Sequence, residues 1–139
     1  MTMTAVDRNL AAIQGIYEAF GRGDLEGMLA PIDADVDWDF AYPSDHAIPW
    51  LQHGRGHAQV VHFMTQFATH LQPVGFEVRE ILSGGNTVVV IFDIECVVKA
   101  TGKTLKEVEE THIWHFNDEG KVIRFRHDAD TLQQYQALQ

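Results

Sequence analysis

The chain has 139 residues, 45% of them apolar, and its 20 acidic against ten basic side chains give a net charge of −10. This length and apolar fraction suit one folded unit, so we expect a single domain over residues 1–139. The negative charge repels phosphate backbones and anionic surfaces, which argues against nucleic acid and membranes as partners. No secretory signal or run of 18 apolar residues occurs, so the sequence predicts a cytoplasmic protein.

The N-terminal segment has the periodicity of two helices. Apolar residues recur at helical spacing over residues 10–20, and the pattern stops at the glycines around Arg22, where glycine can take the left-handed conformation that ends helices. Asp24 then stands at an N-cap position, so a short second helix is expected to run to about Pro31.

Residues 33–40 alternate polar and apolar side chains, which predicts a strand with one face toward a core. The apolar face consists of Val36, Trp38 and Phe40. The aspartates between them face the other way, so we interpret them as a solvated strand face rather than a catalytic carboxylate pair. Residues 41–56 are rich in proline, glycine and aromatic residues and predict a long loop. The sequence does not decide whether this loop closes over the pocket as a lid.

The rest of the chain predicts one helix, four strands and a short final helix. The helix covers residues 60–71 and is closed by Pro73 and Gly75. Period-two segments joined by short turns predict an antiparallel meander, and its strands are 76–82, 87–100, 105–116 and 121–128. Asp130 caps the final helix, which bears Leu132, Tyr135 and Leu138. Helices that precede such a meander predict an α+β fold, in which a curved antiparallel sheet wraps around the helices and encloses a pocket.

The strand at 87–100 is apolar on both faces. Its first face is continuous and predicts the core side, with Val88, Val90, Phe92, Ile94, Cys96 and Val98. Its second face mixes charged residues with Val89, Ile91 and Val97, which is too apolar for solvent alone. We therefore expect a second subunit to cover this outer face.

Two histidines fall on strand faces that carry large aromatic residues. His112 shares a face with Glu110 and Trp114, and His127 shares one with Ile123 and Phe125. Histidine titrates near neutral pH, so such a pair in an apolar pocket could accept and donate a proton. The alternative is that each ring fills space in the core and makes one hydrogen bond.

Metal and cofactor sites are not indicated. Cys96 is the single cysteine, and His112 and His115 face opposite sides of a strand. His53 and His57 are separated by two glycines, which makes a helical pair doubtful. We therefore expect no metal and no cofactor.

Five strings, in their order and spacing, resemble the SnoaL-like and ketosteroid-isomerase-related branch of the nuclear-transport-factor-2-like superfamily. They are Tyr17–Leu25, Asp35–Trp38, Gly54–Gly56, Thr111–Trp114 and Gly120–Arg126. The similarity covers residues 7 to 138. It implies a cone-shaped α+β barrel, commonly a homodimer through the outer sheet face, with a pocket between sheet and helices.

The resemblance also allows a comparison with the catalytic residues of steroid isomerases. These enzymes use an aspartate base and an oxyanion hole made of a tyrosine and a protonated aspartic acid. At the matching positions stand Phe40, Ile16 and His112, of which His112 alone can donate a hydrogen bond. Tyr17 lies about 100° further round its helix than Ile16, so we do not expect it to replace the tyrosine. In the cyclases of this branch an acidic residue near the end of the last strand transfers protons, which makes His127 the candidate base here and His112 its partner.

Three functions remain open. The first is a cofactor-independent isomerase, cyclase or dehydratase that moves a proton next to a carbonyl, with His112 and His127 as catalytic residues. The second is a non-catalytic binder of a small apolar or carbonyl-containing molecule. The third is a dimerising interaction protein that uses the outer sheet face. For the first two, the predicted ligand-binding residues are Ile16, Trp38, Phe40, Trp50, Phe63, Phe92, Trp114 and Phe125.

Overall fold

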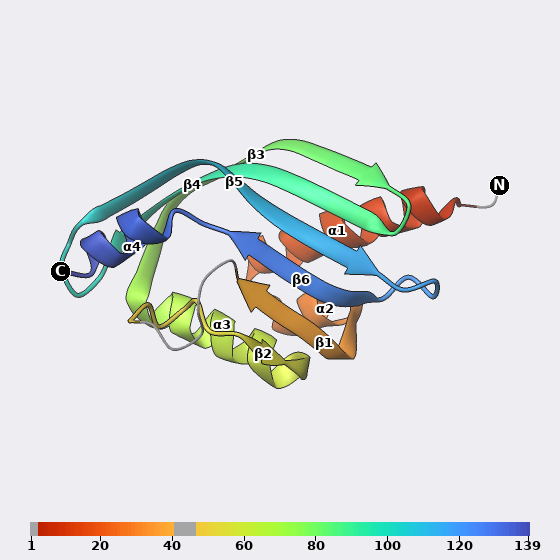
Figure 1. Cartoon of the computed structure of the whole chain (residues 1–139), viewed down its shortest axis with the longest axis horizontal. Helices are drawn as coiled ribbons and strands as arrows, with labels where there is room; N and C mark the ends of the chain where they lie inside the picture. Colours follow the sequence, from red (N-terminus) through yellow and green to blue (C-terminus); the bar gives the residue numbers. More distant parts are fainter. Residues whose placement is uncertain (1–2, 41–46) are drawn as a thin grey trace.

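The computed structural model describes residues 3–40 and 47–139 and confirms the α+β fold (Figure 1). The helices are α1 (Ala5–Arg22), α2 (Leu25–Leu29), α3 (Gly56–His70) and α4 (Thr131–Ala137). The strands are β1 (Ile32–Phe40), β2 (Gly54–Arg55), β3 (Leu71–Gly84), β4 (Thr87–Val98), β5 (Thr104–Phe116) and β6 (Val122–Asp128). No helix of the described residues is long and apolar enough to cross a membrane.

The two N-terminal helices begin and end close to the predicted positions. Thr4 caps α1 through a 3.1 Å hydrogen bond from the Asp7 backbone N–H. Gly23 ends the helix in the left-handed conformation, with φ at +69°. Asp24 caps α2 by accepting from the Gly27 backbone N–H at 2.9 Å.

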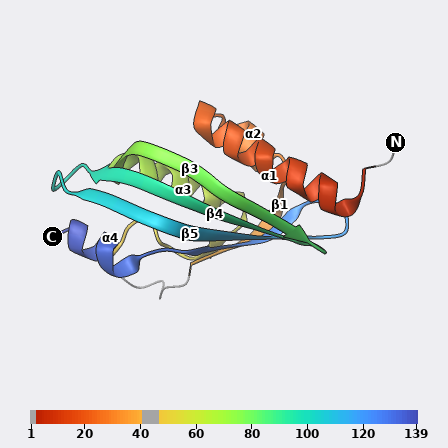
Figure 2. The same cartoon turned by 90° about the horizontal axis from the view of Figure 1, so that it is seen from above.

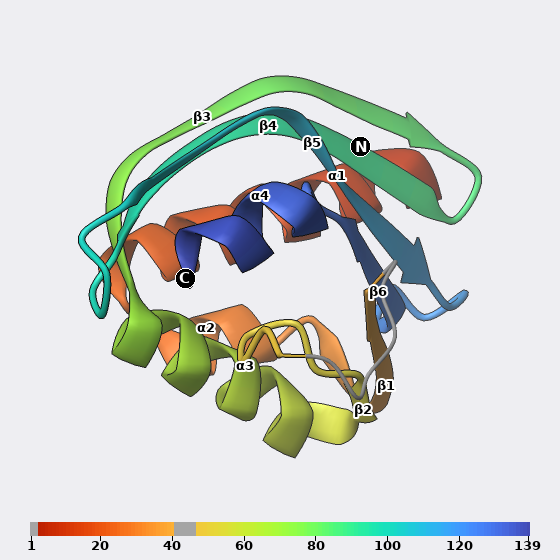
Figure 3. The ribbon, with the colours of Figure 1, turned by 60° about the vertical axis from the view of Figure 1, so that its left-hand side comes forward.

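The strands form one sheet in the order β2-β1-β6-β5-β4-β3. The meander from β3 to β6 is antiparallel, as predicted, and β1 joins it by running parallel to β6. Figure 2 shows α1 lying along the sheet, and Figure 3 shows the long strands arching over the helices. Helix α3 packs against β1, and α4 packs against β5. The curved sheet therefore has an inner face that the helices cover.

Some predicted boundaries differ from the structure. Of the loop at 41–56, residues 41–46 lie outside the described residues, and Gly54–Arg55 forms the short strand β2, paired with β1. Helix α3 begins at Gly56 rather than at residue 60. Strand β3 begins at Leu71 rather than at Phe76, because it is an edge strand. An edge strand tolerates Pro73, which cannot donate to the ladder.

The inner faces of the sheet form the core. Alternate residues of β1 are buried as predicted, namely Val36, Trp38 and Phe40. The same holds for β4, where Val88, Val90, Phe92, Cys96 and Val98 are buried. The outer face of β4 is half-buried.

One prediction for the C-terminal part was wrong. Ile123 is 43% exposed, because Phe116 pairs with Val122 and His115 pairs with Arg124, which leaves Ile123 as an extra, outward residue. The predicted final helix is present as α4, which turns Leu132 outward and buries Gln134 and Ala137.

Candidate functional site

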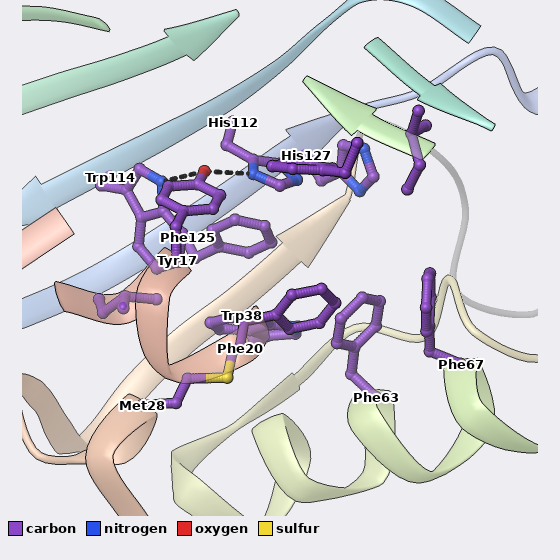
Figure 4. A pocket seen from close by; sticks show the side chains of 13 residues that line it. Tyr17, Phe20, Met28, Trp38, Phe63, Phe67, His112, Trp114, Phe125 and His127 are labelled. Atoms are coloured by element: carbon purple, nitrogen blue, oxygen red, sulfur yellow. Dashed lines mark hydrogen bonds between the residues drawn. The ribbon is translucent and has the colours of Figure 1, made fainter. Parts of the chain in front are cut away.

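A small cavity of about 60 Å³ lies between α1, α3 and the inner face of the sheet and is partly open to solvent (Figure 4). Its walls are mostly aromatic and aliphatic. The lining residues that carry a polar group are Tyr17, Trp38, His112, Trp114 and His127, and the surface they expose to the cavity is almost entirely apolar. The other lining residues are Ile16, Phe20, Met28, Phe63, Phe67, Phe76, Ile94 and Phe125.

The cavity brings together both candidate catalytic histidines and five of the eight predicted ligand-binding residues. These five are Ile16, Trp38, Phe63, Trp114 and Phe125. Two others are buried behind the wall: Phe92 packs on the His112 ring with 4.2 Å between centroids, and Phe40 packs on the His127 ring at 5.7 Å. Trp50 lines a neighbouring chamber instead.

Tyr17 is the polar wall residue that the sequence did not predict. Its hydroxyl lies 2.6 Å from His112 Nδ1 and accepts a hydrogen bond from Trp114 Nε1 at 3.2 Å. Burial raises the pKa of Tyr17, so the hydroxyl keeps its hydrogen at neutral pH. Indole nitrogen only donates, so this hydrogen goes to His112 Nδ1. His112 therefore carries its own hydrogen on Nε2 and acts as a donor.

His112 and His127 are cross-strand partners on β5 and β6, and their rings meet edge to face with centroids 4.5 Å apart. Burial lowers the pKa of His112 well below its ordinary value, and the nearby His127 lowers it further. Burial also lowers the pKa of His127, to about 4. Both rings are consequently neutral at pH 7.

His127 is held by Glu110, whose Oε2 lies 2.9 Å from His127 Nε2. The other ring nitrogen, Nδ1, is buried and has no hydrogen-bond partner among the described residues. A carboxylate at Nε2 favours the tautomer with hydrogen on that nitrogen, which leaves a lone pair on Nδ1. The Glu110–His127 pair thus has the form of an oriented base.

A second chamber lies on the other side of His127. It shares Phe63, Phe67, Ile94 and His127 with the first cavity. Its polar wall is a hydrogen-bonded series in which Trp50 Nε1 donates to Gln134 at 2.8 Å and Gln134 Nε2 donates to Glu107 at 3.0 Å. Trp50 therefore holds a buried polar network in place.

Metal-ligand geometry does not occur within residues 3–40 and 47–139, where no group of three or more His, Cys, Asp or Glu side chains could hold a metal ion. His57 Nε2 bonds the Ile32 carbonyl oxygen at 2.7 Å, and His53 pairs with Asp39. These two histidines are thus engaged with different partners.

The SnoaL-like domain family matches residues 13–125, which is most of the chain. The chain belongs to the SnoaL-like family. A search of curated proteins found no match. Among solved structures, an NTF2-like protein from Burkholderia xenovorans is 25% identical, with a TM-score of 0.85 over 99% of this chain and 100% of that one. TerC, co-crystallised with polyporic acid, is 26% identical, with a TM-score of 0.76 over 94% and 98%. A candidate polyketide cyclase from Xanthomonas campestris pv. campestris is 20% identical, with a TM-score of 0.74 over 98% and 100%, which shows the fold alone.

In this SnoaL-like chain, sequence reasoning missed the roles of Tyr17, which lines the cavity, and of two buried glutamates, Glu107 in the second chamber and Glu110 at His127. The comparison of single positions did not reveal the contact of Tyr17 with His112, because helical rotation describes its Cβ, whereas the long side chain reaches the histidine ring. Glu110 had a signal, since it precedes His112 by two residues on one strand face. Glu107 had none, because it lies three residues from Glu110 and strand alternation sends the two to opposite faces.

Proposed function

We propose that this SnoaL-like protein binds a small, mostly apolar carbonyl compound in the cavity and moves a proton next to the carbonyl, without a cofactor. The observation that carries the proposal is the pair of neutral histidines on one cavity wall, each with one nitrogen fixed by a different partner. Isomerisation, cyclisation and dehydration all begin with such a proton transfer.

His112 is the proposed oxyanion donor. Trp114 donates to Tyr17 and Tyr17 donates to His112 Nδ1, so each bond polarises the next and strengthens the Nε2–H donor. A preorganised donor in an apolar site stabilises a developing enolate by about 3 kcal/mol. Because the ring is neutral, this stabilisation comes from a hydrogen bond rather than from a charge.

His127 is the proposed base. In the step, the carbon–hydrogen bond next to the carbonyl breaks, its hydrogen forms a bond to Nδ1, and the electron pair moves to the carbonyl oxygen. The imidazolium that forms faces Glu110, whose carboxyl accepts the Nε2–H bond at 2.9 Å. Return of the proton to another carbon completes an isomerisation with all atoms balanced.

The comparisons support a small organic guest. TerC, 26% identical, was crystallised with polyporic acid, and similarly folded proteins include a candidate isomerase and a candidate polyketide cyclase. The names of these relatives differ, so they support the reaction class and not one substrate.

Deuterium exchange tests the proposal without a known substrate. Small ketones such as cyclohexanone and indanone are incubated in deuterium oxide, and NMR follows the loss of the hydrogens next to the carbonyl. We expect the protein to accelerate exchange and His127→Gln to reduce the acceleration by about 10²-fold or more.

The matched control is His62→Gln, since His62 is exposed on α3 and away from the cavity. It should exchange the ketones as fast as the unchanged protein. Equal rates for His127→Gln and His62→Gln would remove His127 as the base.

A non-catalytic binder is the second candidate, and the low pKa of His127 favours it, because a base with a pKa of about 4 attracts protons weakly. Saturable binding of a ketone with no exchange above the background rate would establish this alternative.

We also propose a homodimer through the outer sheet face. Val89 and Ile91 are half-buried there, and Leu82, which pairs with Val89, is 49% exposed. The apolar side chains would be covered by a second copy. Sedimentation at micromolar concentration should show twice the mass of the chain, and a monomer would exclude this contact.

A further inference from the structure

Two carboxyl groups are buried beside the candidate base. Glu107 is 4% exposed and Glu110 is 5% exposed. Within residues 3–40 and 47–139 no lysine or arginine forms an ion pair with either of them. Burying two unpaired negative charges costs several kcal/mol, so at least one carboxyl must hold a proton.

A bulge in β5 turns both carboxyls to the inner side. Strand β4 advances two residues, from Phe92 to Ile94, while β5 advances three between their partners, Glu110 and Glu107. The extra residue is accommodated at Glu109, whose φ is +58°, a left-handed conformation that costs about 1–3 kcal/mol in a residue other than glycine. Asp93 holds it in place by accepting from the Glu109 backbone N–H at 3.0 Å.

Glu107 and Glu110 shift each other's pKa in opposite directions. Burial, and then the neighbouring Glu110, raise the pKa of Glu107 to about 9. Burial raises the pKa of Glu110 also, whereas the neighbouring Glu107 opposes that rise. Of the two carboxyls, Glu107 is the one whose pKa the neighbouring carboxyl raises further. Glu110 Oε1 is buried and has no hydrogen-bond partner among the described residues.

The carboxyls connect two spaces. Both line a surface groove between β5, β6 and the start of α4. On the inner side, Glu110 contacts His127, which lines the cavity, and Glu107 lines the second chamber. A continuous series of groups able to carry a proton thus runs from the groove to the cavity.

We propose that Glu107 and Glu110 hold one proton between them and exchange protons between His127 and water in the surface groove. This rests on the proposed function, since it gives the base a route back to its neutral form. When Nδ1 has taken a proton, the Nε2–H bond breaks and an O–H bond forms on Glu110. The pair then holds two protons and releases one to water in the groove, which leaves a neutral ring with its hydrogen on Nδ1. When Nδ1 gives that hydrogen to the product carbon, the pair takes a proton from the groove and Glu110 returns one to Nε2, which restores the lone pair on Nδ1 and the carboxylate at Glu110.

The surroundings favour retention of one proton by the pair. Asp130, at the start of α4, donates its backbone N–H to Glu107 Oε1 at 2.9 Å and adds a second carboxylate nearby. Among the described residues, the other titratable or charged groups around the pair and His127 are Lys106, Glu109, Cys96, His112 and Asp128. Of these groups only the lysine is positively charged at neutral pH.

NMR titration of the ligand-free protein, with labelled glutamate carboxyl carbons and histidine ring nitrogens, tests the proposal. We expect one buried carboxyl to stay protonated at pH 7 and to titrate on the alkaline side. Glu107→Gln should abolish that step and slow exchange of the His127 Nε2 hydrogen with water by about 10²-fold. Glu109→Gln is the matched control on the same bulge, 65% exposed, and should change neither.

Two results would overturn the proposal. One is that both carboxyls of the unchanged protein are ionised at pH 7. The other is that Glu107→Gln leaves the exchange rate unchanged. Because no ketone is present, either result is separate from the outcome of the deuterium assay. The titration of the unchanged protein decides the first point even if a variant fails to fold.

Discussion

Glu107→Gln should make the protein more stable at pH 9 but not at pH 5. The folded chain holds a proton on Glu107 up to about pH 9, whereas the unfolded chain releases it near the ordinary value of 4.5. Between these pH values the unfolded state binds fewer protons, so the free energy of unfolding falls as the pH rises. Glutamine cannot ionise, and it keeps the shape and hydrogen bonding of the protonated acid.

The gain at pH 9 should be at least about 2 kcal/mol, since one pKa unit corresponds to about 1.4 kcal/mol. Urea unfolding at the two pH values measures it. Glu109→Gln removes an equal charge from the exposed side of the bulge and should change stability by less than about 0.5 kcal/mol. A Glu107→Gln curve parallel to that of the unchanged protein would mean that Glu107 is ionised in the fold.

Tyr17→Phe should destabilise the protein by about 1–3 kcal/mol, because it removes one hydroxyl and leaves two partners unpaired. Trp114 Nε1 loses its acceptor, and His112 Nδ1 loses its donor. Urea unfolding at pH 7 measures the loss. In the same variant, the nitrogen NMR signals of His112 should no longer show hydrogen on Nε2 alone.

Tyr135→Phe is the control for the loss of a hydroxyl, since Tyr135 is 42% exposed on α4. We expect its unfolding free energy to stay within about 0.5 kcal/mol of the unchanged value. If Tyr17→Phe were equally mild and left the His112 tautomer in place, the hydroxyl would not fix the donor.

The fold follows from local patterns in most of the chain. Period-two alternation placed Trp38 and Phe92 in the core, and the capping residues Asp24 and Asp130 marked the starts of two helices. These predictions succeed because they depend on neighbours in sequence. The edge position of β3 depends on tertiary structure. The sequence pattern therefore did not predict that the strand begins before Pro73.

The candidate site shows where period-two alternation along a strand fails to predict which face a residue lies on. His112 and His127 follow from strand faces, and the structure places them together as cross-strand partners. Glu107 and Ile123 do not, because an extra residue in the strand reverses the face of everything beyond it. Bulges depend on partner strands, so period-two reasoning within β5 or β6 alone cannot locate them.

The resemblance to steroid isomerases helped to predict the candidate site but did not predict all of its polar groups. It compared single positions, and the tyrosine position holds Ile16, which led to the expectation that the hydroxyl is lost. The structure shows a hydroxyl from the next residue, Tyr17, at His112. A reach of several ångströms along a tyrosine side chain thus offsets a rotation of about 100° at its Cα.

The most direct test of the central claim is a high-resolution crystal structure of the protein soaked with indanone. We expect the ketone in the cavity, with its oxygen within hydrogen-bond distance of His112 Nε2 and the adjacent carbon next to His127 Nδ1. A cavity that stays filled by its own side chains at saturating ketone, or a ketone bound elsewhere, would contradict the account.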